Sequence, residues 1–408
     1  MRRVVVTGIA GFSPIGNDWP SIYKNLKAMK TGIVRIDDWD KYEGLNTRLG
    51  APVDFEVPSH YKRKQLRSMG RVAQLAVSSA ERALQDANLL ENSVLQTGNV
   101  GVSFGSSAGD TKAIADFGNM LLNLSSDGLN ANSYIKMMAH TSPVNIGVHF
   151  GLKGRVITTS SACTSASQGI GYGYEAIKFA KQDIMLAGGC ESLCATQAAV
   201  FDTLFATSTN NDQPDQSPRP FDKNRDGLVI GEGACTLILE ELEHATARGA
   251  KIYAELVGFA TNSDGCHVTQ PSKITMESVI RSALKDANLS AGDIGYISAH
   301  GTATDRGDIA ESAATAAVFG NKTPISSLKS FTGHTLGACG ALEAWTAIEM
   351  MNNSWFHASA NLVEIDPDCA DLDYITKHGR DKVVEYVMSN NFAFGGINTS
   401  LIFKKWQC

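Results

Sequence analysis

The feature that most constrains the fold is an internal repeat: residues 83–89 read ALQDANL and residues 283–289 read ALKDANL. Each repeat closes an amphipathic stretch, at 68–90 and 274–289, in which apolar residues recur at helical spacing. Each stretch precedes a strand-like run ending in glycine, VGVSFG at 100–105 and IGYISAHG at 294–301. Two helix–strand units in the same order predict a duplicated α/β domain.

The rest of the chain alternates between strand-like apolar runs and helical stretches, which predicts parallel sheets with helices on both faces. The runs lie at residues 183–189, 234–242, 251–260 and 383–390, and a first strand is expected at Arg3–Thr7. A glycine-rich turn, Gly8–Gly11, would follow it; its spacing is not G-x-G-x-x-G, so we expect no nicotinamide cofactor. The 408 residues exceed the usual size of one core, so we expect two halves, 1–250 and 251–408.

Composition excludes several classes of function. The net charge of −6 argues against a general nucleic-acid binder. No apolar run approaches the roughly 18 residues that span a bilayer, and the N-terminus lacks the apolar core of a signal peptide. The eight cysteines are scattered rather than spaced as a disulfide framework, so a cytoplasmic location is expected.

No metal site is expected either. Cys190 and Cys194 lack a second ligand pair for zinc. The segment 222–227, DKNRDG, resembles the start of a calcium loop, but the twelfth position is Gly233 and the nearest carboxylate, Glu232, comes one residue early.

The most informative segment for chemistry is ITTSSACTSASQG at 157–169, where a β-branched run meets small residues around Cys163 before a helix. Small neighbours let the chain turn sharply and leave the sulfur accessible, and a helix N-terminus would stabilise its thiolate. A structural reading, in which Cys163 is a small buried apolar residue, fits the local sequence equally well.

Two histidines lie where a strand is expected to end or a helix to begin. His300 stands in SAHGTATDRGD and His334 in KSFTGHTLGACG. Such positions hold the binding and catalytic residues of α/β folds, although a lone histidine is more often structural.

Together, several blocks resemble one family, the elongating β-ketoacyl-acyl carrier protein synthases of the thiolase superfamily. The blocks are ACTS at 162–165, RPFDKNRDGLVIGEGA at 219–234, HGTAT at 300–304, K-x-x-x-G-H at 329–334 and NFAFGGIN at 391–398. They follow the order and spacing of the family and cover essentially the whole chain. The resemblance implies a duplicated thiolase-like fold with five layers, α-β-α-β-α, and a dimer.

The resemblance also implies roles for individual residues. Cys163 would take an acyl chain from a carrier protein as a thioester, and His300 and His334 would stabilise the charge formed when malonyl-carrier protein loses CO2. The backbone N–H groups of Cys163 and Phe394 would form the oxyanion hole. Lys329 would hold the second histidine, and Glu343 would be the buried carboxylate linked to that lysine.

Three alternatives remain open beside chain elongation in fatty acid synthesis. The first is a non-catalytic chain-length partner of the same fold, which would lack Cys163. The second is a thiolase-like acyltransferase on coenzyme A esters; it would need a second catalytic cysteine, and Cys339, inside an expected helix, is interpreted as core. The third is a specialised polyene or polyketide ketosynthase that works with a chain-length partner.

Substrate contacts are implied in the same way. Thr269, Thr302 and Thr304 would bind the phosphopantetheine arm of the carrier protein, and no other cofactor is expected. Phe201, Phe392 and Ala108 would line the acyl pocket, where a small residue at 108 leaves room for a long or rigid chain. Ala393 stands between two phenylalanines of the gate loop, where the family usually has glycine.

A basic cluster at 61–67 is a candidate docking surface for the acidic carrier protein. Its cations are Lys62, Arg63, Lys64 and Arg67. A solvated charged face is the competing interpretation. Acyl length and saturation, the pathway, and the choice between a homodimer and a heterodimer with a chain-length-factor-like homologue lie beyond the sequence.

Overall fold

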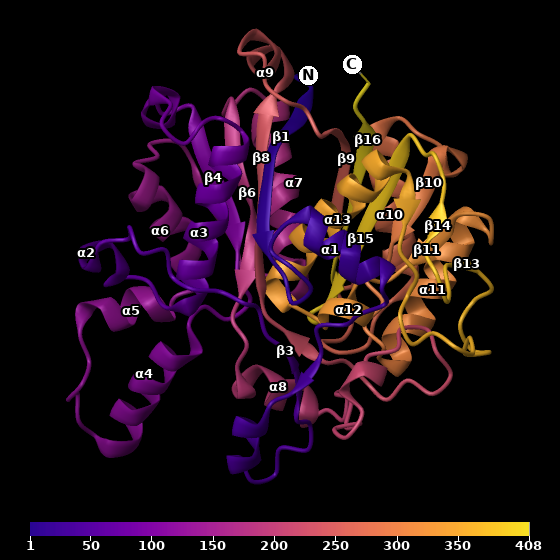
Figure 1. The fold of residues 1–408 in the computed structure, drawn as a ribbon, viewed down its shortest axis with the longest axis horizontal. Helices are drawn as coiled ribbons and strands as arrows, with labels where there is room; N and C mark the ends of the chain where they lie inside the picture. Colours follow the sequence, from indigo (N-terminus) through magenta and orange to yellow (C-terminus); the bar gives the residue numbers. More distant parts are fainter. Residues whose placement is uncertain (408) are drawn as a thin grey trace.

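The computed structural model describes residues 1–407, and its centre is a mixed sheet of eleven strands (Figure 1). The sheet runs in the order β13-β11-β10-β15-β16-β9-β1-β8-β6-β4-β5. Its two halves join where residues 4–6 of β1 pair antiparallel with residues 254–256 of β9. The strands are β1 Val4–Phe12, β4 Val100–Gly105, β5 Val156–Thr159, β6 Ile184–Glu191, β8 Gly233–Glu241, β9 Ala254–Ser263, β10 Ile294–Ser298, β11 Pro324–Ser326, β13 Asp373–Tyr374, β15 Tyr386–Ala393 and β16 Ile397–Lys405.

The two halves repeat one pairing scheme. In the first, β1 pairs antiparallel with β8, β8 antiparallel with β6, β6 parallel with β4, and β4 parallel with β5. In the second, β9, β16, β15, β10 and β11 pair in the same sequence of directions. The strand order therefore confirms the predicted duplication.

Helices complete five layers. α7 (Ser165–Lys178) and α13 (Cys339–Asn353) lie between the two halves of the sheet and contact strands of both (Figure 1). α3 (Arg71–Asp86) and α6 (Thr141–Phe150) cover the outer face of one half, and α10 (Lys273–Ala287) and α11 (Asp305–Phe319) cover the other. The predicted α-β-α-β-α architecture is confirmed.

The repeated ALxDANL motif closes a helix onto a glycine of the neighbouring strand. In one half the Asp86 carboxylate accepts the N–H of Ile9 at 2.9 Å, and in the other Asp286 accepts that of Phe259 at 3.2 Å. The glycine just before each donating residue, Gly8 or Gly258, lies against the two alanines of the motif. A Cβ at Gly8 would lie 2.5 Å from a helix carbonyl, and one at Gly258 would lie 2.7 Å from the equivalent carbonyl. The motif recurs because the same helix–strand contact is made twice.

One predicted element is wrong: Gly8–Gly11 is not a turn but the continuation of β1. Gly8 lies against α3, and a Cβ at Gly11 would lie 3.0 Å from the Trp345 ring of α13. Both glycines let helices approach the strand closely.

The remaining elements surround these layers. A three-stranded sheet orders β2-β3-β7, and β12 pairs with β14. Among the described residues no helix has the length and apolar character needed to cross a bilayer. The elements are β2 Val34–Arg35, β3 Leu49–Ala51, β7 Ile230–Gly231, β12 Trp355–Phe356, β14 Arg380–Asp381, α1 Trp19–Lys27, α2 Arg63–Leu66, α4 Thr111–Asn123, α5 Ala131–Met137, α8 Ala195–Asp202, α9 Leu242–Ala247 and α12 Lys329–Thr332.

Candidate active site

Cys163 lies in a tight turn between β5 and α7. Residues 162–164 form one 3-10 turn that runs directly into α7, and Ala162 has a φ of +50°. The Ser165 hydroxyl holds the turn, because it donates to the Ala162 carbonyl at 2.7 Å and accepts the N–H of Ser161 at 3.0 Å. The small residues expected to allow a sharp turn at the helix start are the ones that form it.

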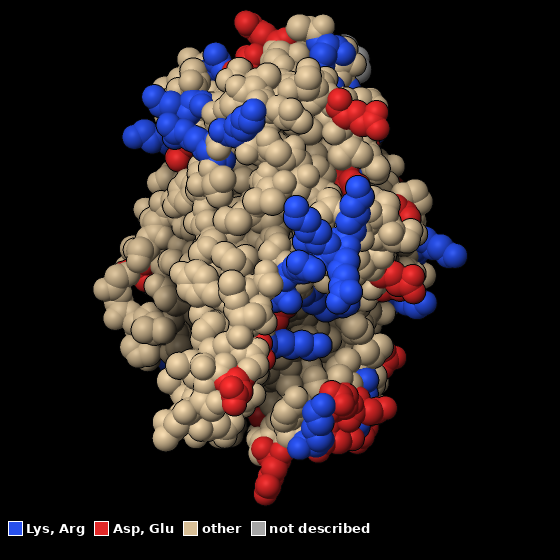
Figure 2. Space-filling view, turned by 90° about the vertical axis from the view of Figure 1, so that its left-hand side faces the viewer, with Lys and Arg blue, Asp and Glu red and all other residues tan. Residues whose placement is uncertain are grey.

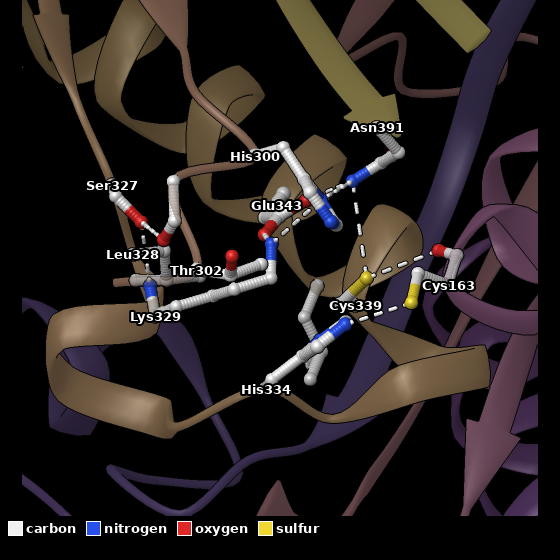
Figure 3. Close-up of polar contacts among 12 residues, drawn as sticks. Cys163, His300, Thr302, Ser327, Leu328, Lys329, His334, Cys339, Glu343 and Asn391 are labelled. Carbon is white, nitrogen blue, oxygen red and sulfur yellow. Dashed lines mark hydrogen bonds and ion pairs between the residues drawn. The ribbon is translucent and has the colours of Figure 1, made fainter. Parts of the chain in front are cut away.

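The two histidines predicted from sequence lie beside this cysteine. Nε2 of His334 is 2.9 Å from Sγ of Cys163, and the rings of His300 and His334 meet edge to face at 5.2 Å. The sulfur and one nitrogen of each imidazole lie within 4.8 Å of one another (Figure 3). All three side chains are buried.

Hydrogen bonds to Nδ1 assign the tautomer of both rings. The N–H of Leu336 donates to Nδ1 of His334 at 3.3 Å, and Nζ of Lys329 lies 3.2 Å from Nδ1 of His300. Since a lysine ammonium can only donate, both Nδ1 atoms accept and both protons lie on Nε2. Burial, and after it the charge of Lys329, hold the pKa of each histidine well below its usual value. Both rings are therefore neutral N–H donors at neutral pH.

Lys329 contacts the first histidine, which corrects the expectation that it holds the second. Its ammonium lies between His300 and Glu343 in a fully buried position, and Asn391 donates to the other carboxylate oxygen of Glu343 at 2.6 Å (Figure 3). Burial is the largest single influence on the pKa of Lys329 and lowers it, but the charge and hydrogen bond of Glu343, together with the other groups beside the ammonium, hold that pKa above its usual value. The link from lysine to Glu343 is as predicted.

The resting state of Cys163 differs from the sequence expectation. The helix start predicts a stabilised thiolate, but burial raises the pKa of the Cys163 thiol to about 11. The Lys329 charge and the backbone N–H groups of Phe394 and Cys163 act in the opposite direction without outweighing burial. The same two N–H groups are the ones implied as an oxyanion hole, and they face the sulfur.

Three residues that sequence reasoning missed hold this site in place. Glu311 accepts the N–H groups of His300 and Gly301, each at 2.7 Å, and burial raises its pKa to about 8. Asn391 lies at the start of the NFAFGGIN block at 391–398 and donates to Glu343. Glu191 accepts the N–H groups of Ser107 at 2.8 Å and Gly337 at 3.1 Å, and so joins β6 to the turn after His334. The sequence does offer one sign of this role, because Glu311 is a carboxylate eleven residues after His300, on the helix that follows it.

A cavity of about 570 Å³ opens onto Cys163, His300 and His334. Thr269, Thr302 and Thr304 line it, as predicted for the arm site, and the hydroxyls of Thr302 and Thr304 are 2.9 Å apart. The predicted acyl-pocket residues Phe201 and Phe392 line it too, and the rings of Phe201 and Phe394 lie 5.1 Å apart.

Other positions named in the sequence analysis do not line this cavity. Ala108, in the loop between β4 and α4, is not part of its lining. Cys339 is buried at the first position of α13, outside the lining, and its thiol donates to the Cys163 carbonyl at 3.2 Å. The basic cluster lies in and beside α2, where all four cations are exposed, on the face of the molecule where Figure 2 shows Lys and Arg side chains gathered. Those cations are Lys62, Arg63, Lys64 and Arg67.

Two family models together match most of the chain. The Beta-ketoacyl synthase N-terminal domain matches residues 1–245, and the corresponding C-terminal domain matches residues 253–363.

The chain belongs to the β-ketoacyl synthase family.

This confirms the family resemblance found in the sequence. The chain is 36% identical to 3-oxoacyl-[acyl-carrier-protein] synthase 2 of Vibrio harveyi, over 99% of each protein. It is 55% identical to a crystal structure of a β-ketoacyl synthase from Burkholderia phymatum STM815, with a TM-score of 0.99 over the full length of both. It is also 32% identical to the solved structure titled "The ishigamide ketosynthase/chain length factor", with a TM-score of 0.91 and full coverage of both chains.

Proposed function

We propose that this β-ketoacyl synthase extends acyl chains by decarboxylative condensation of malonyl-carrier protein with an acyl group held on Cys163. The observation that carries the proposal is the buried group of one thiol and two imidazole N–H donors at the end of a cavity. The curated relative in Vibrio harveyi, named for 3-oxoacyl-carrier-protein synthesis, supports the choice of carrier.

The first step is thioester exchange at Cys163. Its sulfur forms a bond to the acyl carbonyl carbon, the bond from that carbon to the arm sulfur breaks, and the thiol proton goes to the departing arm sulfur. The N–H groups of Cys163 and Phe394 would hold the carbonyl oxygen while it carries negative charge. A thiol pKa of about 11 makes the His334 hydrogen bond important, since it stabilises charge on the sulfur as the proton leaves.

The second step breaks the carbon–carbon bond of the malonyl thioester. CO2 leaves, and the electron pair moves to an enolate whose charge lies on the thioester oxygen. His300 and His334, both neutral with the proton on Nε2, would donate to that oxygen from two sides. The enolate carbon then attacks the acyl carbonyl, a new carbon–carbon bond forms, and the Cys163 sulfur leaves and takes up a proton that solvent supplies.

Lys329 acts in this scheme as a positioning residue. Its ammonium, oriented by Glu343 and Asn391, fixes the tautomer of His300 and disfavours protonation of both imidazoles. We divide the chain into halves at 1–250 and 251–408, with the nucleophile in the first and both histidines in the second. The repeated strand pairing supports that division.

The carrier protein would present its phosphopantetheine arm through the cavity, past Thr269, Thr302 and Thr304. The exposed cations at 62–67 are the proposed docking surface, supported by their solvent exposure and by the acidic character of carrier proteins. A cytoplasmic location stays a prediction from the sequence.

A specialised ketosynthase that pairs with a chain length factor is the second candidate. It is supported by the likeness to a structure named as a ketosynthase/chain length factor, which is 32% identical to this chain over the full length of both. Ala393, where glycine is usual in the gate loop, also points away from a housekeeping enzyme. In this reading the partner would be a homologous subunit instead of a second copy.

The deciding experiment incubates the purified protein with malonyl-carrier protein and acyl-carrier proteins of graded length and saturation. Wild type is expected to condense and Cys163→Ala to form neither acyl-enzyme nor product. Cys194→Ala, which changes a partly buried cysteine outside the cavity, is the matched control and should retain activity. Condensation by Cys163→Ala would overturn the proposal. The preferred acyl chain separates fatty acid elongation from polyene or polyketide chemistry.

A further inference from the structure

The rim of the Cys163 cavity carries one cation with no counter-charge among the described residues. Two arginines line the cavity, Arg225 and Arg306. The Arg225 side chain is 3% exposed, and its guanidinium contacts Asp366 and lies 3.3 Å from Asp305. Arg306 is exposed and forms no ion pair or side-chain hydrogen bond within residues 1–407. Its charge is therefore available to a ligand.

The acidic side chains of the lining are already engaged. Asp264 accepts from the Asn398 amide at 2.7 Å, and Asp226 accepts from the Ser208 hydroxyl at 2.8 Å. Glu311 is buried against the backbone of His300. Two carboxylates of the lining are exposed. One is Asp226, which the Ser208 hydroxyl engages, and the other is Asp305, next to Arg306, which faces the Arg225 guanidinium.

Arg306 stands at the solvent end of a line of polar groups that starts near Cys163. Thr302 is buried, Thr304 is half-buried and Arg306 is exposed, all on one continuous segment of the cavity wall. The loop 264–271 contributes His267 to the same lining, and Nδ1 of this histidine accepts the N–H of Thr269 at 3.1 Å. Its Nε2–H is thereby left as a second donor at the rim.

We propose that Arg306, assisted by His267, binds the phosphate of the phosphopantetheine arm where the arm leaves the cavity. The inference rests on the proposed function, since an arm that reaches Cys163 past Thr302 and Thr304 emerges beside Arg306. A planar guanidinium suits a phosphate because it donates two parallel hydrogen bonds to it. The same phosphate chemistry occurs in a carrier-protein arm and in coenzyme A, and we assign it to the carrier arm.

The test compares two small thioesters with the same acyl chain, one of pantetheine and one of 4′-phosphopantetheine. The readout is the rate at which Cys163 becomes acylated, followed by intact-protein mass. Arg306→Ala should slow acylation by the phosphorylated thioester about tenfold, as expected for loss of a charge-assisted hydrogen bond at an accessible site. It should leave the unphosphorylated thioester unchanged, and Arg306→Lys should recover part of the rate.

The matched charge control is Lys322→Glu against Arg306→Glu. Lys322 is exposed just beyond the other end of α11, a helix of 15 residues and so about 22 Å long. Both variants lose the same charge, so a selective loss in Arg306→Glu with acyl-carrier protein supports the subsite. Equal loss in the two variants, equal loss with both small thioesters, or no loss would overturn it. Loss with acyl-coenzyme A but not with acyl-carrier protein would overturn the assignment to the carrier arm.

This readout is independent of condensation. If wild type becomes acylated but never condenses with malonyl-carrier protein, the proposed function fails while the phosphate subsite can still be measured. If wild type condenses and Arg306 variants behave as wild type on phosphorylated thioesters, only the subsite fails.

Discussion

The turn that carries Cys163 has a counterpart in the other half of the duplicated chain. Residues 162–164 form a 3-10 turn that leads into α7, and residues 336–338 form one that leads into α13. Both turns begin with a non-glycine residue at positive φ, +50° at Ala162 and +45° at Leu336. The second residue is Cys163 in one turn and Gly337 in the other.

Packing explains why only one of these turns carries a functional side chain. The Gly337 N–H donates to Glu191, and a Cβ at Gly337 would lie 2.7 Å from the Ser107 nitrogen and 2.8 Å from a Glu191 oxygen. The Cys163 side chain instead points to His334 and to the cavity. The two halves therefore share the same turn backbone, but the buried Glu191 leaves no room for a side chain at Gly337.

Giving the first turn the residue of its counterpart should have the largest effect. Cys163→Gly removes the sulfur, so the acyl-enzyme should disappear and condensation should fall at least about 1000-fold, as when other covalent nucleophiles are removed. Steady-state condensation and intact-protein mass measure the two losses. If Cys163→Gly keeps its activity with an unchanged circular dichroism spectrum, Cys163 is not the reacting residue that distinguishes the two turns.

The reverse change tests the packing side. Gly337→Ala places a methyl group against backbone and a buried carboxylate, so we expect the free energy of unfolding to fall by about 3 kcal/mol. Gly147→Ala in α6 is the matched control, because a Cβ there meets nothing within 4 Å and should be neutral or slightly stabilising. Chemical denaturation compares them. Equal stability of the two variants would show that Gly337 is not closely confined.

The electrostatics of Cys163 give a third test. With a thiol pKa of about 11, the thiolate fraction, and with it the rate of alkylation by iodoacetamide, should rise roughly 90-fold between pH 8 and 10. A small thiol with a pKa near 8.5 should gain only about fourfold over the same range. Peptide-level mass spectrometry separates Cys163 from the exposed Cys266. A rate that levels off below pH 9 would mean that the helix start and Lys329 outweigh burial.

Local sequence predicted the fold and the position of the site well, because both depend on short-range patterns. ALxDANL marked the duplication since one helix–strand contact uses those residues in each half. Cys163, His300 and His334 stood out because each lies among small residues at the end of an element, where the structure brings them together.

What the sequence could not predict depends on contacts between distant segments. Lys329 and His334 are five residues apart, yet the lysine reaches His300, because the buried Glu343, held in place by Asn391, draws its ammonium to that side. The raised thiol pKa follows from burial in the folded chain, which the position of Cys163 at a helix start does not predict. Gly8–Gly11 was predicted as a turn since its glycines reflect helix contacts that only the folded chain reveals.

The smallest effect is expected at the position where both turns have a side chain that donates a hydrogen bond. The residue after each 3-10 turn is Ser165 in one half and Cys339 in the other, and each side chain donates to a carbonyl of the Cys163 turn, at 2.7 and 3.2 Å. Cys339→Ser keeps a donor at this position, so acylation and condensation should stay within about threefold of wild type. Cys339→Ala has no donor, so the Cys163 carbonyl loses this hydrogen bond. The rates of acylation and condensation should therefore fall further, about tenfold.

If Cys339 instead exchanged protons with substrate, as the second cysteine of a thiolase-like enzyme would, Cys339→Ser would lose condensation as completely as Cys163→Ala while still forming the acyl-enzyme. That pattern would make the two turns catalytic partners. Parallel rates of acylation and condensation across the two Cys339 variants would leave Cys163 as the reacting sulfur and Cys339 as the support behind its carbonyl.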